Sequence, residues 1–464
     1  MGDTMRRKEV GERALTRSPG TTCPVERGGR RTLRRRIKAV QSYFKQRRVA
    51  LRFDEVPDPR RRRGRRWSAG ALLTTAVLSL MLLARSLRGA ERLSCDLADA
   101  RRVKGLRRRL PDSTLGDFVA RVAPAPLRRH LHAHILAEHR RKALEPTVLP
   151  IRAIAVDGKN VATLRTRVNR DCQRQDTPGQ PTSWLYRVVN ATLISAAAAV
   201  CIDQRPIPAA TNDMGIFRTF YAELCRTYGR AGLFDLVSTD AGFTSEANAR
   251  LIDADGRAYW MALKGNQPEL LAEARRVLLP QSYREAPEAQ TTWELDSSRG
   301  WIRRELWRTG PIAQWTDWTH LRQVVLIRVW KAAGCPHGKA PVAGPPQILE
   351  ERWHVTNLVR GRLTGDQLLA LDRAHWRIEN NLHGTLDIQW QEDHGRWVRR
   401  GRGLPVSALL RVLAYNLLEL LRVVHLRSQE ARAAAWTQLR DWVRDALVWP
   451  DLTAGDAEAT PDLA

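Results

Sequence analysis

The chain has 464 residues, of which 43% are hydrophobic and 27% are charged, and its formal net charge at pH 7 is +28. This length predicts two or three domains, and the hydrophobic share excludes a wholly disordered chain. So large a positive excess indicates a polyanionic partner, of which nucleic acid is the commonest.

The positive charge is concentrated at the start of the chain. Residues 1–66 carry 22 Lys or Arg against 7 Asp or Glu, with runs at Arg34–Arg36 and Arg60–Arg63. Such runs would neutralise DNA phosphates and release counterions. The alternative interpretation of any single run is a solvated basic tail.

The cysteines and the apolar segments bear on the compartment. The six cysteines form no CxxC pair, so neither a zinc site nor a disulfide framework is indicated, and a cytoplasmic location is expected. The segment Met1–Arg13 alternates charges and has no apolar stretch typical of a signal peptide. Ala69–Ala84 is almost wholly apolar but short for a membrane span. We therefore expect a buried helix there and no membrane partner.

The N-terminal third of the chain is predicted to be helical. Residues 1–35 have the composition of a disordered basic tail, and residues 36–147 are expected to form a helical DNA-binding domain. A short basic amphipathic helix is predicted at Ile37–Arg48, followed by a turn around Pro57–Pro59. After the apolar helix, another helix is predicted at Ser113–Val122.

From residue 148 the pattern changes to alternating strands and helices, which should form the first part of an α/β core, residues 148–284. Three strands, a helix, a strand, a helix and a final strand are predicted in this order, which is typical of a ribonuclease-H-like core. The strands are expected at 151–156, 184–194, 196–202, 233–238 and 259–263, and the helices at 213–228 and 245–253.

The remainder of the chain interrupts and then closes this core. Residues 285–358 are predicted to be a β-rich insertion, and residues 359–426 should supply the closing helices, followed by a C-terminal tail at 427–464. Strands are expected at 322–330 and 352–358, and helices at 366–386 and 406–424. The insertion contains seven tryptophans: Trp293, Trp301, Trp307, Trp315, Trp318, Trp330 and Trp353.

Three acidic residues form a candidate catalytic group. Asp157 and Asp240 each follow a predicted buried strand, and neighbouring strand ends of one sheet lie about 5 Å apart. Two carboxylates so placed can share the pair of divalent ions that phosphodiester chemistry uses. Glu379 is the candidate third ligand, since it would share a helix face with His375 and His383.

Each acid also has an ordinary structural interpretation. Asp157 with Gly158 is a common turn, Asp240 begins an ordinary loop, and Glu379 alone would be a surface salt bridge. Glu392 and Asp393 compete with Glu379 for the third position. The three acids are specific only as a set, in this order on this fold pattern.

Four segments carry a resemblance to a known family. Ile154–Lys159, Ser238–Ala241, Ala262–Gln267 and His375–Asn380 resemble the motifs of DDE transposases of bacterial insertion sequences. The chain is most similar to the ISAs1-type branch of the IS4-like superfamily, which includes the H-repeat-associated proteins. The resemblance covers roughly residues 40–425 and includes the segment from Pro57 that precedes the apolar helix.

The resemblance implies a ribonuclease-H-like core with a β-rich insertion, and strand cleavage and strand transfer that depend on Mg²⁺, which Mn²⁺ should replace. By position, Asp157, Asp240 and Glu379 take the catalytic and metal-binding roles. The matching positions expected near DNA are Lys159, Lys264, Asn266, Gln267, His375, Arg377, Asn380 and His383.

The chain departs from the wider group in one respect. That group surrounds its catalytic Glu with Tyr, Arg and Lys, whereas Asp372, His375 and Leu386 stand at the corresponding positions here. In related cut-and-paste enzymes a Trp of the insertion stacks on a flipped base. For the seven tryptophans here, packing inside the β-rich region is the favoured interpretation.

The function predicted from the sequence is therefore that of a nucleoid-associated transposase. It would act as a homodimer on the terminal inverted repeats of its element and on target DNA, with a water attacking first and the freed 3′-hydroxyl second. The alternatives are a catalytically inactive DNA-binding relative and a nuclease of the same fold. A membrane protein is the weakest alternative.

Overall fold

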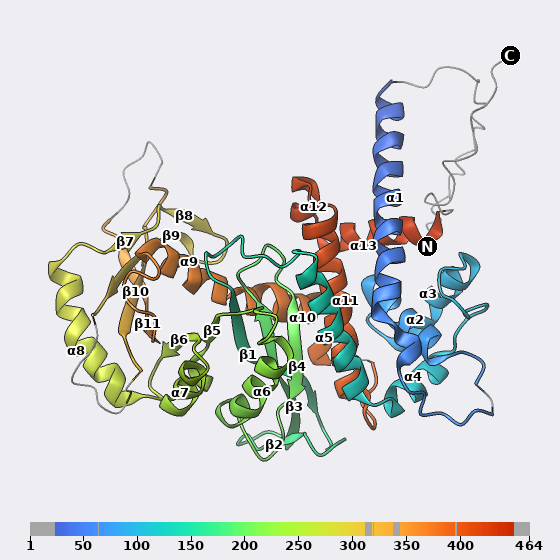
Figure 1. The fold of residues 1–464 in the computed structure, drawn as a ribbon, viewed down its shortest axis with the longest axis horizontal. Coiled ribbons are helices and arrows are strands. Elements are labelled where there is room, and N and C mark those ends of the chain that lie inside the picture. The colour runs from blue at the N-terminus through green and yellow to red at the C-terminus, as the bar shows by residue number, and fades with distance from the viewer. Residues whose placement is uncertain are drawn as a thin grey trace, which may run out of the picture.

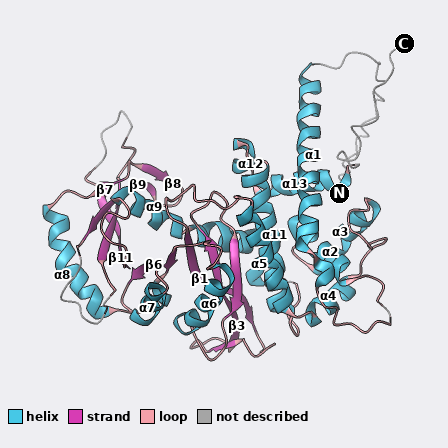
Figure 2. Ribbon diagram, in the orientation of Figure 1, coloured by secondary structure: helices cyan, strands magenta, loops and turns pink. Residues whose placement is uncertain are grey.

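The computed structural model describes residues 24–63, 65–310, 318, 320–336, 344–394 and 397–449. Strands occupy the middle and one side of the molecule, and helices from both ends of the chain gather on the other side (Figures 1 and 2). The molecule is thus a mixed α/β protein. The first 23 residues of the predicted basic tail and the acidic end after Trp449 lie outside the described residues.

All the described strands belong to one mixed sheet. Its order is β2-β3-β1-β5-β6-β11-β10-β9-β7, with β4 paired to β3 and β8 paired to β9. The strands are β1 (Ala153–Leu164), β2 (Gln173–Gln175), β3 (Ser183–Leu193), β4 (Cys201–Pro206), β5 (Leu236–Thr239), β6 (Ala258–Leu263), β7 (Ala289–Gln290), β8 (Glu294–Asp296), β9 (Gly300–Arg308), β10 (Gln323–Lys331) and β11 (Gln347–Thr356).

The first half of the sheet follows the predicted order of elements, with β2 as an addition. Strands β1, β3 and β4 pair antiparallel, while β1, β5 and β6 pair parallel through the crossover helices α6 (Asp213–Tyr228) and α7 (Glu246–Ala254). The strand predicted at 196–202 lies further along the chain, as β4 at Cys201–Pro206, and the predicted end of the first strand at residue 156 was also wrong. Strand β1 continues to Leu164 because β3 pairs with it from Ile154 to Leu164, with one register shift after Asn160. A segment that locally resembles a turn is therefore held as strand by its partner.

The β-rich segment continues the same sheet. Strand β11 pairs antiparallel with β6, and β10 and β9 follow outward. The predicted insertion is therefore joined edge to edge with the first half of the sheet, so that the edge of β6 is covered. Helix α8 (Pro268–Arg284), which the sequence reading missed, connects β6 to these strands and begins with a proline at its first turn.

In the described part of the chain, five helices precede the sheet. They are α1 (Pro24–Leu51), α2 (Ala69–Met81), α3 (Leu87–Asp99), α4 (Asp112–Arg121) and α5 (Pro124–Arg140), with a 3₁₀ turn η1 (Phe53–Glu55) after α1. Because α1 begins at Pro24, the prediction of a disordered tail as far as residue 35 was wrong. The apolar stretch is α2, which starts at an N-cap where Ser68 accepts a hydrogen bond from the Ala71 amide, and its burial is confirmed.

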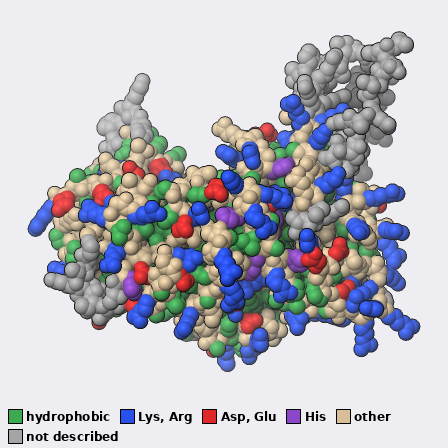
Figure 3. Space-filling model, viewed as in Figure 1, with side chains coloured by type: hydrophobic (Ala, Val, Ile, Leu, Met, Phe, Trp, Pro, Cys, Tyr) green, Lys and Arg blue, Asp and Glu red, His purple; other side chains and the backbone are tan. Residues whose placement is uncertain are grey.

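Basic side chains are exposed over these N-terminal helices. On the face shown in Figure 3, Lys and Arg side chains are frequent over the helical part of the molecule. Arg34, Arg35 and Arg61–Arg63 are exposed. Arg60 is instead held internally, because its guanidinium donates to both oxygens of Asp58 and to the carbonyl of Trp67.

The chain closes with helices that return to the N-terminal ones. They are α9 (Gly365–His375), the π-helical segment η3 (Ile378–His383), α10 (Gly384–Trp390), the 3₁₀ turn η4 (Glu392–His394), α11 (Gly403–Leu420), the π-helical segment η5 (Leu421–His425), α12 (Gln429–Ala433) and α13 (Trp436–Val448). Helix α13, which lies in the predicted tail, packs against α1, and the Gln41 side chain donates to the Ala446 carbonyl.

Helix α11 is the central element of the helical side. Gly403–His425 is the one helix among the described residues that is long and apolar enough to cross a membrane, but 94% of its apolar window is buried inside the protein. It packs on α2, α4, α5 and the edge strand β4. Asn416, which is wholly buried, accepts from the Cys201 amide at 2.8 Å and donates to the Cys201 carbonyl at 2.7 Å. This pair of bonds joins the helix to the sheet.

Asn416→Leu is expected to lower the free energy of unfolding by about 2–4 kcal/mol, since two buried backbone groups lose their partners at about 1–3 kcal/mol each. Urea unfolding followed by circular dichroism measures this. Gln429→Ala, on exposed α12, is the control and should change the free energy by less than about 0.5 kcal/mol. An unchanged urea midpoint for Asn416→Leu would show that these bonds are not what joins α11 to β4.

Candidate active site

The register of the sheet brings the first two acids together. Parallel pairing of β1 with β5 sets Val156 opposite Thr239, and the next residue on each strand is Asp157 or Asp240. Asp240 follows the end of β5, as predicted, whereas Asp157 lies within β1 at the point where the parallel pairing stops. The two carboxyl groups therefore occupy equivalent positions on neighbouring strands.

The two aspartates interact strongly. Burial, followed by the negative charges of Asp240 and Glu379, raises the pKa of Asp157 to about 8. Burial also raises the pKa of Asp240, and the nearby charge of Asp213 adds to the rise. Each acid is held by the backbone that follows it: the Gly158 amide donates to Asp157 Oδ1 at 2.7 Å, and the Gly242 amide to Asp240 Oδ1 at 3.1 Å.

Glu379 reaches this group from the closing helices. Burial and the charge of Asp240 raise its pKa, so the structure brings all three predicted acids into one electrostatic cluster. Glu379 lies in η3, where the helix widens to a π-helical turn that the sequence reading did not foresee. Such turns occur frequently at functional sites because they re-aim side chains. The predicted sharing of one α-helical face by His375, Glu379 and His383 is therefore only approximate.

The three acids suit a hard divalent cation chemically. Mg²⁺ and Mn²⁺ prefer carboxylate oxygens, and the repulsion that raises these pKa values would be relieved by a cation. As the side chains stand, no group of three or more His, Cys, Asp or Glu residues in the described part of the chain converges closely enough to hold one ion. The acids thus interact electrostatically, but their carboxyl groups do not converge on one metal position.

A fourth acid, Asp213, was missed by the sequence reading. Its charge contributes to the raised pKa of both Asp157 and Asp240. Both of its oxygens accept from the guanidinium of Arg187 on β3, at 2.9 and 2.7 Å. A side chain at position 158 would collide with Asp213 Oδ1, so Gly158 is required where this acid approaches. In the sequence, Asp213 could be recognised only as the start of a helix.

Lys264 is a predicted DNA contact that is both exposed to solvent and electrostatically coupled to the acids. It is exposed just after β6, and its charge lowers the pKa that Asp240 and Glu379 would otherwise have. The next two predicted contacts hold the loop that begins at Asp240. Asn266 donates to the carbonyls of Ala241 and Thr244, and Gln267 donates to Thr244.

Two predicted DNA contacts make internal bonds instead. Lys159 is buried, with its ammonium group 2.6 Å from Asp387 and 3.4 Å from Glu392. Arg377 donates to three carbonyls in the segment after β3, those of Ile194, Ala196 and Ala197. These bonds fix the closing helices on the sheet, and a DNA contact by either side chain stays a prediction.

Glu392, one of the competing acids, is wholly buried and lies 3.3 Å from Arg411 in addition to its contact with Lys159. Its charge is thus compensated by two cations inside the protein. Glu379 faces Asp240 instead, and this difference favours Glu379 as the third acid.

The two predicted histidines are buried beside the acids. His375 Nδ1 lies 2.8 Å from the Ser238 hydroxyl on β5, and burial lowers its pKa to about 4. His383 Nδ1 lies 3.5 Å from Asp157 Oδ2, and burial lowers its pKa to about 3. Both rings are therefore neutral near pH 7. Asn380, next to Glu379, is exposed.

A family model described as a transposase DDE domain matches residues 149–417, which is more than half of the chain. The chain belongs to the DDE transposase domain family. The matched region begins just before β1 and ends within α11, so it contains the three acids and the whole sheet.

Two relatives from Escherichia coli K12 have a similar sequence. The putative protein YbfL and the H repeat-associated putative transposase YhhI are each 25% identical over 191 residues, which are 39% of this chain and 47% of each relative. The chain thus spans about half the length of the curated relatives it matches. These matches confirm the resemblance to the H-repeat branch of the DDE transposases.

Among solved structures, the cryo-EM structure of a piggyBac transposase synaptic complex with hairpin DNA is similar to this DDE transposase domain protein at 9% identity. The alignment covers 81% of this chain and 69% of that chain, with a TM-score of 0.41.

The departure from the family pattern has a structural counterpart. Asp372, at the position of the family's Tyr, is buried, accepts from Arg352 at 2.9 Å and lies 3.1 Å from His354 Nε2. The pKa of Asp372 falls to about 2, because the stabilising partners His354 and Arg352 outweigh the cost of burial. The guanidinium of Arg352 also lies over the ring of Trp376. In this DDE transposase domain, Asp372 joins α9 to Arg352 and His354 on β11.

The tryptophans of the β-rich segment mainly pack internally. Trp307, Trp318 and Trp353 are buried, and Trp330 donates to Glu305. Trp293 lies under the guanidinium of Arg303, and Trp315 is outside the described residues. For the buried residues the packing interpretation is confirmed.

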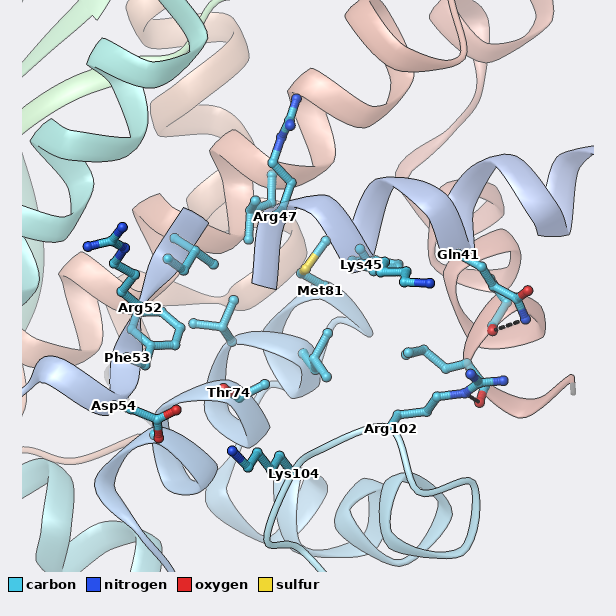
Figure 4. A pocket seen from close by; sticks show the side chains of 18 of the residues that line it. Gln41, Lys45, Arg47, Arg52, Phe53, Asp54, Thr74, Met81, Arg102 and Lys104 are labelled. Carbon is cyan, nitrogen blue, oxygen red and sulfur yellow. Dashed lines mark hydrogen bonds between the residues drawn. The ribbon is translucent and has the colours of Figure 1, made fainter. Parts of the chain in front are cut away.

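A cavity of about 540 Å³ lies away from the acids, among α1, η1, α2, α11 and α13 (Figure 4). Phe53, Thr74 and Met81 line it, with Lys45 and Lys104 among its basic groups. None of the three acids lines this cavity, so it is not part of the candidate active site.

The raised pKa of Asp157 predicts how stability depends on pH. The folded state keeps a proton up to about pH 8 that the unfolded state releases near pH 4. The contribution of this group is therefore fully present below about pH 4 and is lost as the pH rises through about 8. In EDTA, the urea midpoint of the wild type should fall between pH 6 and pH 9 by more than that of Asp157→Asn. Equal falls would contradict the assignment of the raised pKa to Asp157.

Proposed function

We propose that the protein is an insertion-sequence transposase that cleaves DNA strands at the ends of its element and transfers them to target DNA. The observation that carries the proposal is the cluster of Asp157, Asp240 and Glu379, which lies inside the matched DDE domain and raises the pKa of its own members. The sheet from β4 to β6 then corresponds to a ribonuclease-H-like core. The protein would act in the bacterial cytoplasm, on the nucleoid.

In this proposal the three acids hold the divalent ions, Mg²⁺ or Mn²⁺. When bound, such ions supply activation of the attacking oxygen and stabilisation of the leaving oxygen. Asp157 and Asp240 provide ligands from rigid strands, and Glu379 provides one from the closing helix. Asn266 and Gln267 keep the loop after Asp240 in place through their bonds to its carbonyls. No covalent protein–DNA intermediate is needed, so no nucleophilic side chain is assigned.

DNA would be held by charge on two parts of the molecule. Lys264, exposed beside Asp240 and Glu379, would contact the phosphates next to the scissile bond. The exposed arginines of the N-terminal helices would bind the terminal repeat outside the active site. Two ends must be held together during transposition, so we propose a homodimer on DNA.

Asp157→Asn, Asp240→Asn and Glu379→Gln should each abolish cleavage of a labelled duplex that carries the terminal repeat of the element. Loss of a metal ligand removes about 4 kcal/mol or more of transition-state stabilisation, which corresponds to about a thousandfold in rate. Gel analysis of products in Mg²⁺, Mn²⁺ and EDTA measures this.

The matched control for these variants is Glu392→Gln, which is isosteric and alters an acid held inside the protein. It should retain cleavage wherever it folds, and all variants should bind the duplex within about threefold of the wild type. Full cleavage by any of the three site variants removes that residue from the site. Tight binding of the repeat by the wild type with no cleavage in any metal would replace the proposal with that of an inactive DNA-binding relative.

Replacing Arg61, Arg62 and Arg63 together with Gln should weaken DNA binding and lower its dependence on salt. If each arginine contacts one phosphate, the slope of log affinity against log salt becomes shallower by about 2–3. Fluorescence anisotropy from 50 to 300 mM salt gives this slope. The control replaces the exposed arginines Arg275, Arg276 and Arg284 of α8, which should leave the slope unchanged. Equal slopes for both triple variants would mean that the N-terminal run is a solvated surface.

A further inference from the structure

A row of polar side chains crosses the sheet at the position of Asp157. In the register of the sheet, Gln204 on β4 pairs with Asn190 on β3, and Asn190 pairs with Asp157 on β1. Residues that pair across neighbouring strands project to the same face. Gln204 and Asn190 are almost fully buried, so the row consists of polar groups that need partners inside the protein.

His383, at the end of η3, contacts both Asn190 of this row and Asp157. Its Nε2 lies 2.9 Å from Asn190 Nδ2, and its Nδ1 lies 3.5 Å from Asp157 Oδ2. The second distance is long for a hydrogen bond but short enough for electrostatic contact. The ring therefore stands between an amide on β3 and the carboxyl group on β1.

The hydrogen bonds fix which nitrogen of His383 carries the proton. Gln204 Nε2 donates to Asn190 Oδ1 at 3.0 Å, so the oxygen of Asn190 is occupied and its amide nitrogen faces the ring. An amide nitrogen only donates, and His383 Nε2 must therefore accept. The proton of the neutral ring then sits on Nδ1, on the side that faces Asp157.

We propose that His383 is a positioning residue for Asp157, whose Nδ1–H directs and stabilises Oδ2 of the ionised carboxylate, with Asn190 and Gln204 setting its tautomer. The Gly158 amide already binds the other oxygen at 2.7 Å, so with His383 each oxygen would have a donor of the protein beside it. Partners that orient a metal-binding carboxylate strengthen metal binding, and their loss costs about 10–100-fold in affinity. The inference rests on the proposed function, since it assumes that Asp157 is a metal ligand.

Three variants of His383 separate positioning from packing. Asn places an amide near the position of Nδ1 and can still donate to Asp157, whereas Gln places its amide near Nε2 and can bond to Asn190 but not to Asp157. Ala removes both contacts. Affinity for Mn²⁺ alone, measured by electron paramagnetic resonance of the free ion, should fall about tenfold or more for Gln and Ala and by less than about threefold for Asn.

Unfolding of each variant in urea is measured alongside, in EDTA. A purely structural role would make Mn²⁺ affinity follow stability, so that the better-packed Gln variant would bind Mn²⁺ better than Asn; this order would overturn the proposal. Wild-type affinity in both Gln and Ala would also overturn it. Asp157→Asn serves as the reference, and wild-type Mn²⁺ affinity in that variant would instead refute the proposed metal site. If the Ala variant fails to fold, the comparison of Mn²⁺ affinity between the Asn and Gln variants still tests the proposal.

Discussion

The parallel pairing of β1 with β5 is the constraint on which the rest of the site depends. It sets Asp157 and Asp240 at equivalent positions on strands that lie side by side, where two carboxylates repel each other across a poorly solvated space. Burial raises the pKa of both acids, and the charge of Asp240 adds to the rise for Asp157. The sheet tolerates this electrostatic repulsion because β1 and β5 are each paired on both edges, and these backbone hydrogen bonds fix the strands that carry the acids.

The third acid is brought to these strands by bonds that do not involve it. Arg377 donates hydrogen bonds to carbonyls of the segment after β3, and the His375 ring is hydrogen-bonded to the Ser238 hydroxyl on β5. Lys159 joins β1 to α10 through Asp387 and to the following turn η4 through Glu392. Each contact joins the closing helices to a strand of the sheet or to the segment that follows one. Several side chains that the family motifs mark are thus occupied in assembling the site, whereas Lys264, Asn266 and Asn380 are exposed.

The sequence was most informative where a pattern has one physical solution. The alternation of apolar strands with α6 and α7 predicted the order of the first half of the sheet, and the family motifs identified the acids that the structure brings together. Other features depend on contacts between distant segments. Strand β1 runs past its turn-like Asp-Gly because β3 holds it, and the approach of Asp213 to Asp157 follows from packing at the start of α6. Local composition gives no indication of either.

The same distinction explains why the β-rich segment was predicted as an insertion but not as an extension of the sheet. Its strands are visible in the sequence as apolar stretches rich in Trp and Val, but an edge-to-edge pairing of β11 with β6 leaves no local mark. The pairing has a mechanical consequence. Strand β6 is held on both edges, by β5 and β11, and the loop that follows it carries Lys264. A rigid strand thereby sets the position of a positive charge that acts on both Asp240 and Glu379, while α8 leaves from the same loop toward the outer strands.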